Sequence, residues 1–355
     1  MPALVRNTIA VEIHQASYFS SDTKLDLALL ASVRDQVVES GIELRPGINR
    51  ILVQAFDGIG GTGNELARES ADIWFDDGTV QEASETLDGH DIVWNANLGP
   101  YHVTTDLVIP AGTNLTIEPG TTVYFDEDTS LTVSGQLIAR GNEVERIRFT
   151  SVPAAPFVSN RPANSNGLPD GPPRWDGIHF VDSNSPENVI AYADFDYAED
   201  LRGSIGIDHS QLLVDNVSFR GTHLRMIESN ASSYVIRHST FPDMFAENEV
   251  PAELGLDNIS EHIHSVGIPP EGGQMLIQGN TFGTNKGHND VIDANSGRRP
   301  GTVLQIIDND FAGARDEELD LGLDRLNLIS PYHAYSVIVD EENKVVTKSA
   351  TSTGL

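Results

Sequence analysis

The feature that most constrains the fold of this chain is a recurring apolar pair, an Ile or Val followed five positions later by a Phe. The pair occurs five times, at Ile190 and Phe195, Val214 and Phe219, Ile236 and Phe241, Ile277 and Phe282, and Ile306 and Phe311. Successive phenylalanines are 24, 22, 41 and 29 residues apart. Three of these steps match the roughly 20–30 residues of one coil in a parallel β-helix.

The five-residue spacing within each pair also carries geometric information. Side chains on one face of a flat strand recur every second residue, so two inward side chains five positions apart require a bend between them. We expect this bend at a corner, where one short sheet of the coil passes into the next. Coils stacked about 4.8 Å apart then place Phe on Phe, with Asn280 and Asn309 stacked nearby. Since no coil buries its apolar residues alone, its neighbours complete the core.

The pattern therefore predicts an all-β protein, a parallel β-helix preceded by small β-sandwich-like segments. The predicted boundaries are 1–32 for a partial jelly-roll-like β segment with an open sheet edge, 33–76 for a small β unit, 77–94 for a linker, 95–328 for the β-helix and 329–355 for a C-terminal tail. The long step between phenylalanines predicts an insertion at about 242–272 that loops outside the coil. Within the second unit, Gly58–Gly63 is expected to be a hairpin loop rather than a nucleotide-binding loop, because no Lys follows and no βαβ pattern surrounds it.

Several stretches resemble known families. Five of them resemble the opening coils of bacterial secreted proteins of the pectin-lyase-like superfamily, namely Val108–Gly120, Gly120–Phe125, Leu131–Gly141, Ile147–Ser151 and Trp175–Phe180. Three more are similar to the β-helix of large bacterial surface proteins that also carry lamin-tail-like or spore-coat-kinase-like modules, namely Phe241–Phe245, Leu254–Glu261 and Gly279–Asp293. The resemblance implies a right-handed β-helix and an extracellular or cell-surface location. It implies no single activity, because the superfamily includes lyases, hydrolases, adhesins and inert spacers.

Charge and composition exclude several classes of partner. With 53 Asp+Glu against 22 Lys+Arg, the formal charge is −31, which disfavours nucleic acids and anionic lipid surfaces. The chain has no Cys, which excludes disulfides and thiolate metal sites. It also lacks a run of 18 apolar residues, so we expect no membrane span, and residues 1–20 do not have the pattern of a signal peptide. Hard Ca²⁺ is the natural partner of such a surface, and solubility in a salty medium is the alternative explanation.

An acidic cluster provides the best candidates for a metal site. The predicted metal ligands are Asp290, Asp293, Asp316, Glu317 and Asp320, with His288 and Asn289 as further binding residues. About one coil separates the two acidic groups, so their carboxylates would lie about 5 Å apart in neighbouring coils. Carboxylates that close repel unless a cation or a proton intervenes, which favours bound Ca²⁺. A solvated acidic loop edge is the alternative.

Catalytic candidates are fewer. A polysaccharide lyase needs a base beside a neutralised uronate, and Lys286, Arg298 and Arg299 are the cations that flank the acidic cluster. A glycoside hydrolase would instead need two carboxylates from that cluster. His262 and His264 alternate on an extended segment and would suit Zn²⁺, but surface histidines are the commoner explanation. Trp175 is expected in the core or the coil wall.

We therefore expect a non-catalytic structural, adhesive or glycan-contacting module, with a polysaccharide or cell-surface glycan as partner and Ca²⁺ as ion. A Ca²⁺-dependent lyase on acidic glycans is the rival hypothesis. A truncated product without independent activity is the third.

Overall fold

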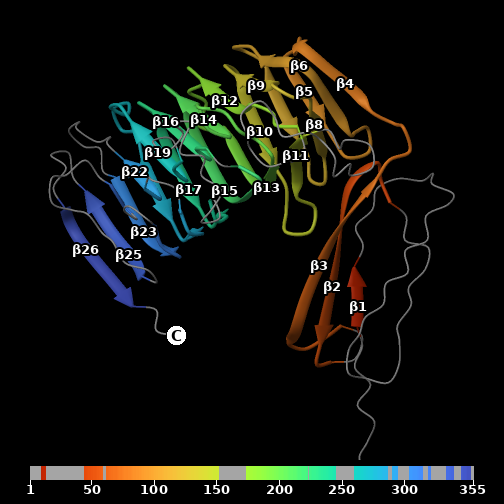
Figure 1. Ribbon diagram of the computed structural model, residues 1–355. Helices are drawn as coiled ribbons and strands as arrows, with labels where there is room; N and C mark the ends of the chain where they lie inside the picture. The colour runs from red at the N-terminus through yellow and green to blue at the C-terminus, as the bar shows by residue number, and fades with distance from the viewer. Residues whose placement is uncertain are drawn as a thin grey trace, which may run out of the picture.

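The computed structural model describes residues 9–12, 44–58, 61–151, 173–222, 224–244, 260–286, 290–294, 304–314, 319–320, 333–339 and 345–352. Every regular element in these ranges is a β-strand (Figure 1). A large set of strands, from β4 to β24, pairs in parallel and winds into a parallel β-helix, as the repeat predicts. No helix within the described ranges is long and apolar enough to cross a membrane.

The β-helix has three walls, each built from strands one coil apart. The first wall contains β8 (Thr122–Phe125), β11 (Ile147–Ser151), β18 (Thr240–Phe241) and β21 (Thr281–Phe282). The second wall contains β9 (Ser130–Val133), β12 (Gly177–Val181), β14 (Ile205–Asp208), β16 (Ile227–Asn230), β19 (Ile263–Val266), β22 (Ile292–Ala294) and β24 (Leu319–Asp320). The third wall contains β5 (Asp91–Trp94), β7 (Asn114–Ile117), β10 (Gln136–Arg140), β17 (Ser233–Arg237) and β20 (Met275–Gln278).

Longer strands run through the corners and belong to two walls. They are β13 (Val189–Asp196), β15 (Gln211–Arg220) and β23 (Leu304–Phe311) between the third and first walls, and β4 (Gln81–Thr86) and β6 (Tyr101–Ile109) between the first and second. These corners contain the bend that the five-residue spacing requires. A residue with positive φ stands three positions before each repeat Phe, namely Tyr192, Asn216, His238, Gly279 and Asp308, with φ between 49° and 63°. At Gly279 the absence of a Cβ removes the steric cost of this conformation.

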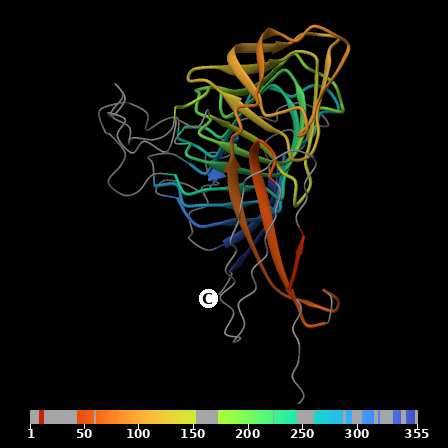
Figure 2. The same cartoon turned by 90° about the vertical axis from the view of Figure 1, so that its right-hand side faces the viewer.

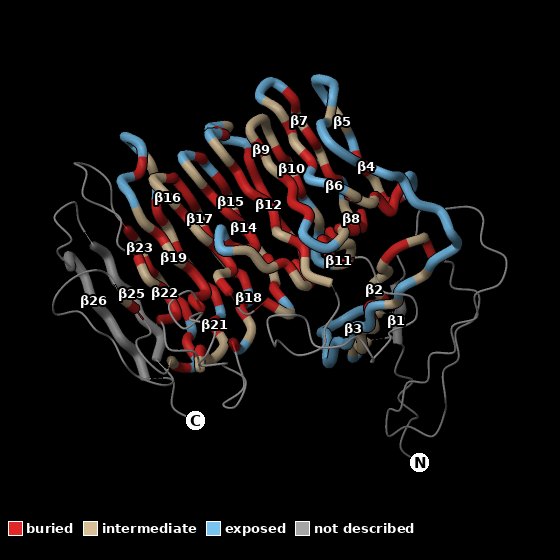
Figure 3. Tube along the Cα trace, turned by 45° about the horizontal axis from the view of Figure 1, so that its top comes forward, coloured by how far each residue is buried: buried red, intermediate tan, exposed pale blue. Residues whose placement is uncertain are grey.

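The phenylalanines of the repeat form a stacked column inside the coils. Phe195, Phe219, Phe241, Phe282 and Phe311 are at most 5% exposed, so the inward prediction is confirmed. Ring centroids of successive members lie 5.6, 5.2, 4.6 and 4.9 Å apart. Phe149 extends the column toward the N-terminus, 5.0 Å from Phe195. Figure 3 shows the result as buried stretches on the strands of the middle coils, such as β12, β15 and β17.

Buried asparagines stack as well. Asn280 Nδ2 donates to Asn309 Oδ1 at 2.9 Å, and both residues are almost fully buried. The Asn309 oxygen also accepts the backbone N–H of Asn280, while Asn280 Oδ1 accepts the backbone N–H of Ser239 in the preceding coil. Each amide thus satisfies buried backbone groups of its neighbour, which water does not reach.

Both ends of the β-helix differ from the sequence prediction. The linker predicted at 77–94 contains β4 and β5, which pair in parallel with β6 and β7 as part of the coils. These first strands have a neighbour on one side and are mostly exposed, so their sequence is as polar as a linker. The tail predicted at 329–355 contains β25 (His333–Val339) and β26 (Val345–Ser352). β25 pairs antiparallel with β23, and β26 pairs with β25.

The insertion predicted at 242–272 is also too long. β19 lies within it and pairs in register with β16, Ile263 beside Ile227. Ile263 is fully buried, so the chain has already returned to the coil at this point. The predicted range merged a coil strand with the residues before it, because Pro, Glu and Asp surround both.

The N-terminal region forms one antiparallel sheet instead of two separate units. β1 (Ile9–Glu12) pairs with β2 (Gly47–Phe56), and β2 pairs with β3 (Glu65–Phe75). β2 and β3 pair as a hairpin, as predicted, and Gly58 N–H donates to Thr62 O at its turn end. The β2–β3 hairpin meets the first wall at the N-terminal end of the β-helix and extends away from it (Figures 1 and 2).

Candidate functional site

Four of the predicted site residues lie within the described ranges, namely Lys286, Asp290, Asp293 and Asp320. The other predicted residues lie outside them, namely Arg298, Arg299, Asp316, Glu317, His288 and Asn289. The structure therefore tests the geometry of only part of the predicted cluster.

Two of these residues, Asp293 and Asp320, belong to an outward-facing column on the second wall. Glu228 on β16, His264 on β19, Asp293 on β22 and Asp320 on β24 are in parallel register, one residue per coil. We call these four residues the acid–histidine column. Asp293 and Asp320 are neighbours in the column, so two carboxylates do lie side by side in successive coils. The partner in register is Asp320 rather than Asp316.

His264 connects the carboxylates of the column. Its Nδ1 lies 2.7 Å from Glu228 Oε2, and its Nε2 lies 3.7 Å from Asp293 Oδ2. Arg225 reaches the same place, with Nη1 3.0 Å from Glu228 Oε2 and Nε 2.6 Å from Glu261 Oε2. This histidine thus has a local ionic role. Sequence reasoning did not assign that role, because Glu228 is distant in the sequence and becomes a neighbour only through coil register.

Protonation in the column follows from partial burial and charge. Burial, followed by the charges of Glu261 and Asp320, raises the pKa of Asp293 to about 6, although His264 acts in the opposite direction. Burial lowers the pKa of His264, but the hydrogen bond to Glu228 and its charge outweigh burial, so the pKa is raised overall. Burial also raises the pKa of Glu261 despite Arg225. Burial and the neighbouring charges thus favour the protonated forms of both Asp293 and His264.

The described residues supply only part of a Ca²⁺ site. Ca²⁺ takes about six to eight oxygen ligands, whereas Asp293 and Asp320 offer two adjacent carboxylates. Within the described ranges, no group of three or more His, Asp or Glu residues has an arrangement that would hold a metal ion. Further ligands would have to come from the predicted residues outside these ranges.

Lys286 and Asp290 do not assemble a catalytic pair. Among the described residues, Lys286 makes no ion pair with Asp290 or Asp293, and its backbone N–H donates to Met244 O. Asp290 is buried, and Asn285 Nδ2 donates to its carbonyl oxygen at 2.7 Å. These contacts fix the corner of the coil and bring no base to the acid–histidine column.

Two residues weighed from sequence belong to the core. Trp175 is fully buried, stacks on Phe125 at 4.0 Å and donates from Nε1 to Asp196 O, as expected. His262 is also fully buried, with its ring edge-on to Phe241 and Phe282. Burial lowers the pKa of His262 to about 4, so this histidine is neutral. The prediction that His262 is a surface histidine is therefore wrong.

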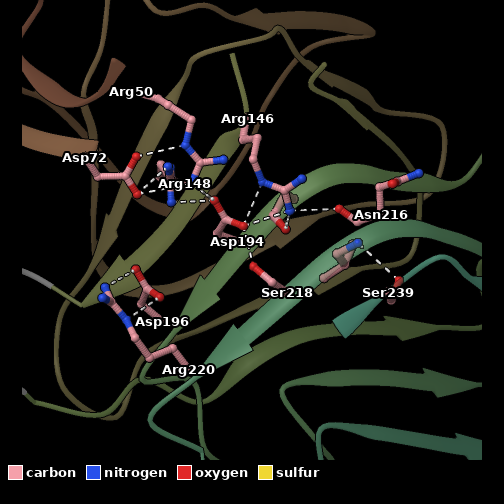
Figure 4. A network of polar contacts seen from close by, with 12 residues as sticks. Arg50, Asp72, Arg146, Arg148, Asp194, Asp196, Asn216, Ser218, Arg220 and Ser239 are labelled. Atoms are coloured by element: carbon pink, nitrogen blue, oxygen red, sulfur yellow. Dashed lines mark hydrogen bonds and ion pairs between the residues drawn. The ribbon is translucent and has the colours of Figure 1, made fainter. Parts of the chain in front are cut away.

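A second charged cluster was not predicted. It joins the β2–β3 hairpin to the first wall and contains Arg45, Arg50, Arg146 and Arg148 with the carboxylates of Asp72, Glu145 and Asp194. Figure 4 shows the part of it around Asp72 and Asp194. We call it the arginine junction. Asp72 on β3 lies 2.9 Å from Arg50 Nε and 2.7 Å from Arg148 Nη2. Asp194 on β13 contacts Arg146 at 2.7 Å and also contacts Arg148.

Hydrogen bonds flank the junction. Ile48 N–H donates to Thr122 Oγ1 at 3.0 Å, and Trp74 Nε1 donates to Tyr124 Oη at 2.8 Å. Burial pushes the pKa of Asp194 upward, but Arg148 and Arg146 outweigh burial and leave it lowered.

The sequence contains a signal for this site: Arg146 and Arg148 alternate, as do Asp194 and Asp196, which places charge on an outer face. The sequence did not predict that the β2–β3 hairpin packs over these charges and buries them.

Comparison with known proteins gives a short match. The chain is 41% identical over 64 residues to Protein bark beetle of Drosophila melanogaster. The match covers 18% of this chain and 2% of that protein, so this chain spans only a small part of the protein that it resembles. No family model matches the sequence, and no solved structure matches it.

Proposed function

We propose that this chain is a non-catalytic β-helix module that serves as a stiff structural or adhesive element and contacts glycans. The observation that carries the proposal is how the outward polar side chains are used. In the described coils they pair with their neighbours one coil away, at Asp91 and Asn114, Asp196 and Arg220, Asp208 and Asn230, Asp215 and Arg237, and Glu228 and His264. Such pairs tie each coil to the next.

This arrangement favours a structural role over catalysis for a physical reason. A catalytic site requires an acid or base within hydrogen-bond reach of one reacting atom, together with groups that hold the substrate there. Asp196, Asp208 and Asp215 instead accept from Arg220, Asn230 and Arg237, spread along three successive coils. Distributed pairs of this kind stiffen a rod.

An exposed polar row supplies a surface for glycan contact. Thr240, Thr281 and Asp310 are in register on the outer face of the first wall, and all three are exposed. Neighbouring strands lie about 4.8 Å apart, which is close to the repeat of an extended sugar chain. Hydroxyl and carboxylate groups at this spacing would hydrogen-bond successive sugar units. We call these three residues the threonine row.

Several finer assignments belong to the same proposal. They are membership of the pectin-lyase-like superfamily, the right-handed sense of the coils, an extracellular or cell-surface location, and a role for Ca²⁺ at Asp293 and Asp320. The Ca²⁺ assignment predicts a higher melting temperature in millimolar Ca²⁺ than in chelator, through mass action. The double variant Asp293→Asn and Asp320→Asn should lose that gain. If the original chain melts at the same temperature in both conditions, the acidic residues form only a solvated edge and bind no Ca²⁺.

One panel of acidic polysaccharides tests the module against the lyase. We expect saturable binding to at least one uronate-containing glycan and no unsaturated product by absorbance, with or without Ca²⁺. The double variant Thr240→Ala and Thr281→Ala should weaken binding about 10-fold or more, as the loss of two hydrogen bonds predicts. Thr86→Ala, an exposed threonine on β4, is the matched control and should bind normally. Accumulation of unsaturated product would replace our proposal with the lyase.

A further inference from the structure

The threonine row belongs to a longer outward column of the first wall. Parallel register joins one residue from each coil between β8 and β23 into this column. Its members are, in order, Thr122, Arg148, Asp194, Ser218, Thr240, Thr281 and Asp310. Thr122, Arg148 and Asp194 are at most 5% exposed, whereas the column is accessible to solvent from Ser218 onward. We call the three buried members the covered stretch.

A second outward column of the same wall becomes accessible at the same coil. Three of its members are buried in successive coils, namely Tyr124, Thr150 and Asp196. Arg220 follows them in the next coil and is exposed. The hairpin contacts both columns on the buried side of this boundary, at Thr122, Tyr124 and Arg148. Figure 4 shows Asp72 of the hairpin beside Arg148 there. The hairpin therefore covers the N-terminal part of a surface whose C-terminal part is open to solvent.

The interface under the hairpin is polar and incompletely hydrogen-bonded. The covered stretch presents a hydroxyl, a guanidinium and a carboxylate to the hairpin, where a permanent interface would be more apolar. Arg148 Nη2 and Asp194 Oδ2 are buried and form ion pairs, but neither atom makes a hydrogen bond. Buried polar atoms are normally hydrogen-bonded, and water would reach both atoms once the hairpin lifts. These features favour a hairpin that can separate from the wall.

Gly47, the first residue of β2, sets how closely the hairpin approaches the wall. Its φ is 105°, and a Cβ at this position would lie 2.7 Å from Thr122 Oγ1 and 3.0 Å from Thr122 Cβ. Only glycine fits at this distance and in this backbone conformation. A side chain at position 47 would thus push the hairpin away from the covered stretch without changing any charge.

We propose that the β2–β3 hairpin is an autoinhibitory cover over the glycan-contacting surface, and that an extended sugar chain must displace it to bind along the whole column. The inference rests on the proposed function and adds a dependence on chain length. At about 4.8 Å per coil, the open part from Ser218 to Asp310 spans about 14 Å, and the column from Thr122 to Asp310 spans about 29 Å. A short oligomer fits the open part and leaves the hairpin in place. A longer chain gains the hydroxyl and charged groups of the covered stretch only in molecules whose hairpin has lifted, so the closed form lowers its apparent affinity.

A matched pair of glycine variants of the full chain tests the cover. The probes are oligomers of galacturonic acid and of mannuronic acid with about three or about eight units, sized to the open part and to the whole column. In Gly47→Ala the longer oligomer should bind at least 10-fold more tightly than to the original chain, with binding of the shorter one unchanged, as calorimetry would show. Gly78→Ala is the control, because Gly78 also has a positive φ, of 81°, but a Cβ there would meet no atom within 4 Å. This variant should bind both lengths as the original chain does.

Asp72→Asn provides a second way to loosen the hairpin. It weakens the ion pairs with Arg50 and Arg148 and alters no member of the column, so it should give the same length-dependent gain. Hydrogen exchange should be faster in β2 and β3 of both loosened variants and unchanged in β17 and β20, which shows that the coils stay folded. If exchange in the hairpin does not change, or if the hairpin loosens and the ratio of the two affinities stays the same, the hairpin is no cover and only this inference fails. If neither oligomer length binds to any of these proteins, the proposed function fails and this inference fails with it.

Discussion

The β-helix and the β2–β3 hairpin are stabilised by different forces. Strands in the middle coils, such as β13 and β15, have parallel neighbours on both sides and bury an aromatic column, whose members Phe195 and Phe241 are almost inaccessible. β3 is exposed along Glu65–Asp72, as Figure 3 shows, and the hairpin is attached to the first wall through charges and a few hydrogen bonds. The β-helix therefore depends on apolar burial, whereas the attachment of the hairpin depends on ionic contacts.

The largest effect is expected from the core. Phe241→Ala removes a ring that stacks on Phe219 and Phe282 and leaves a cavity between coils. The free energy of unfolding should fall by about 3–5 kcal/mol. Urea unfolding followed by circular dichroism measures this change. A loss below about 1 kcal/mol would mean that the coils do not depend on the aromatic column.

The next effect separates the two regions. Asp194→Asn leaves Arg148 and Arg146 without their shared carboxylate in a buried site and should cost about 3 kcal/mol. The change should free the hairpin before the coils unfold, so limited proteolysis should cleave near β2 and β3 first. Ser218→Ala, which removes one hydrogen bond to the same carboxylate, is the milder control. Unfolding of the coils together with the hairpin would contradict the separation.

The two regions should also respond to pH with opposite signs. Asp293 on the β-helix has a folded-state pKa near 6, above its unfolded value, so its stabilising contribution is present in acid and is lost as pH rises through about 6. The pKa of Asp194 is lowered, so its contribution is present at neutral pH and is lost only in acid, below the pKa of an ordinary Asp of about 3.9.

Asp293→Asn isolates the first of these terms. At about pH 8 the variant should be about 1–2 kcal/mol more stable than the original chain, because it carries no buried carboxylate charge. At about pH 4 the two proteins should unfold alike. Urea titrations at both pH values provide the comparison. A variant that is less stable at the higher pH would show that the Asp293 carboxylate is stabilised by a partner or an ion.

The smallest effect concerns a single contact of the hairpin. Trp74→Phe removes the hydrogen bond from Trp74 Nε1 to Tyr124 Oη and should cost about 1 kcal/mol. Tyr124→Phe removes the same bond from the other side. In a double-mutant cycle the two changes should be strongly non-additive. Additive losses would mean that the contact contributes little to hairpin attachment.

The sequence predicted the inside of the molecule better than the outside. The spacing of Ile236 and Phe241 fixes an inward pair and a corner, because burial and strand geometry act within one coil. Outer contacts depend on which residues lie one coil apart or under a covering element. Glu228 and His264 are 36 residues apart, which is longer than one coil of the repeat, so the repeat did not predict their contact. The contact of Asp72 with Arg148 requires knowledge of where the hairpin packs, and no periodicity encodes that.

Hydrogen exchange measured by mass spectrometry on the full chain tests the central distinction most directly. Amides of β17 and β20 should exchange only through global unfolding, while amides of β2 and β3 should exchange through an opening of lower free energy. In Asp194→Asn, protection of β2 and β3 should fall at least 10-fold, with β17 and β20 unchanged. Equal protection in both regions, or a loss in Asp194→Asn that spreads equally to β17 and β20, would contradict the account.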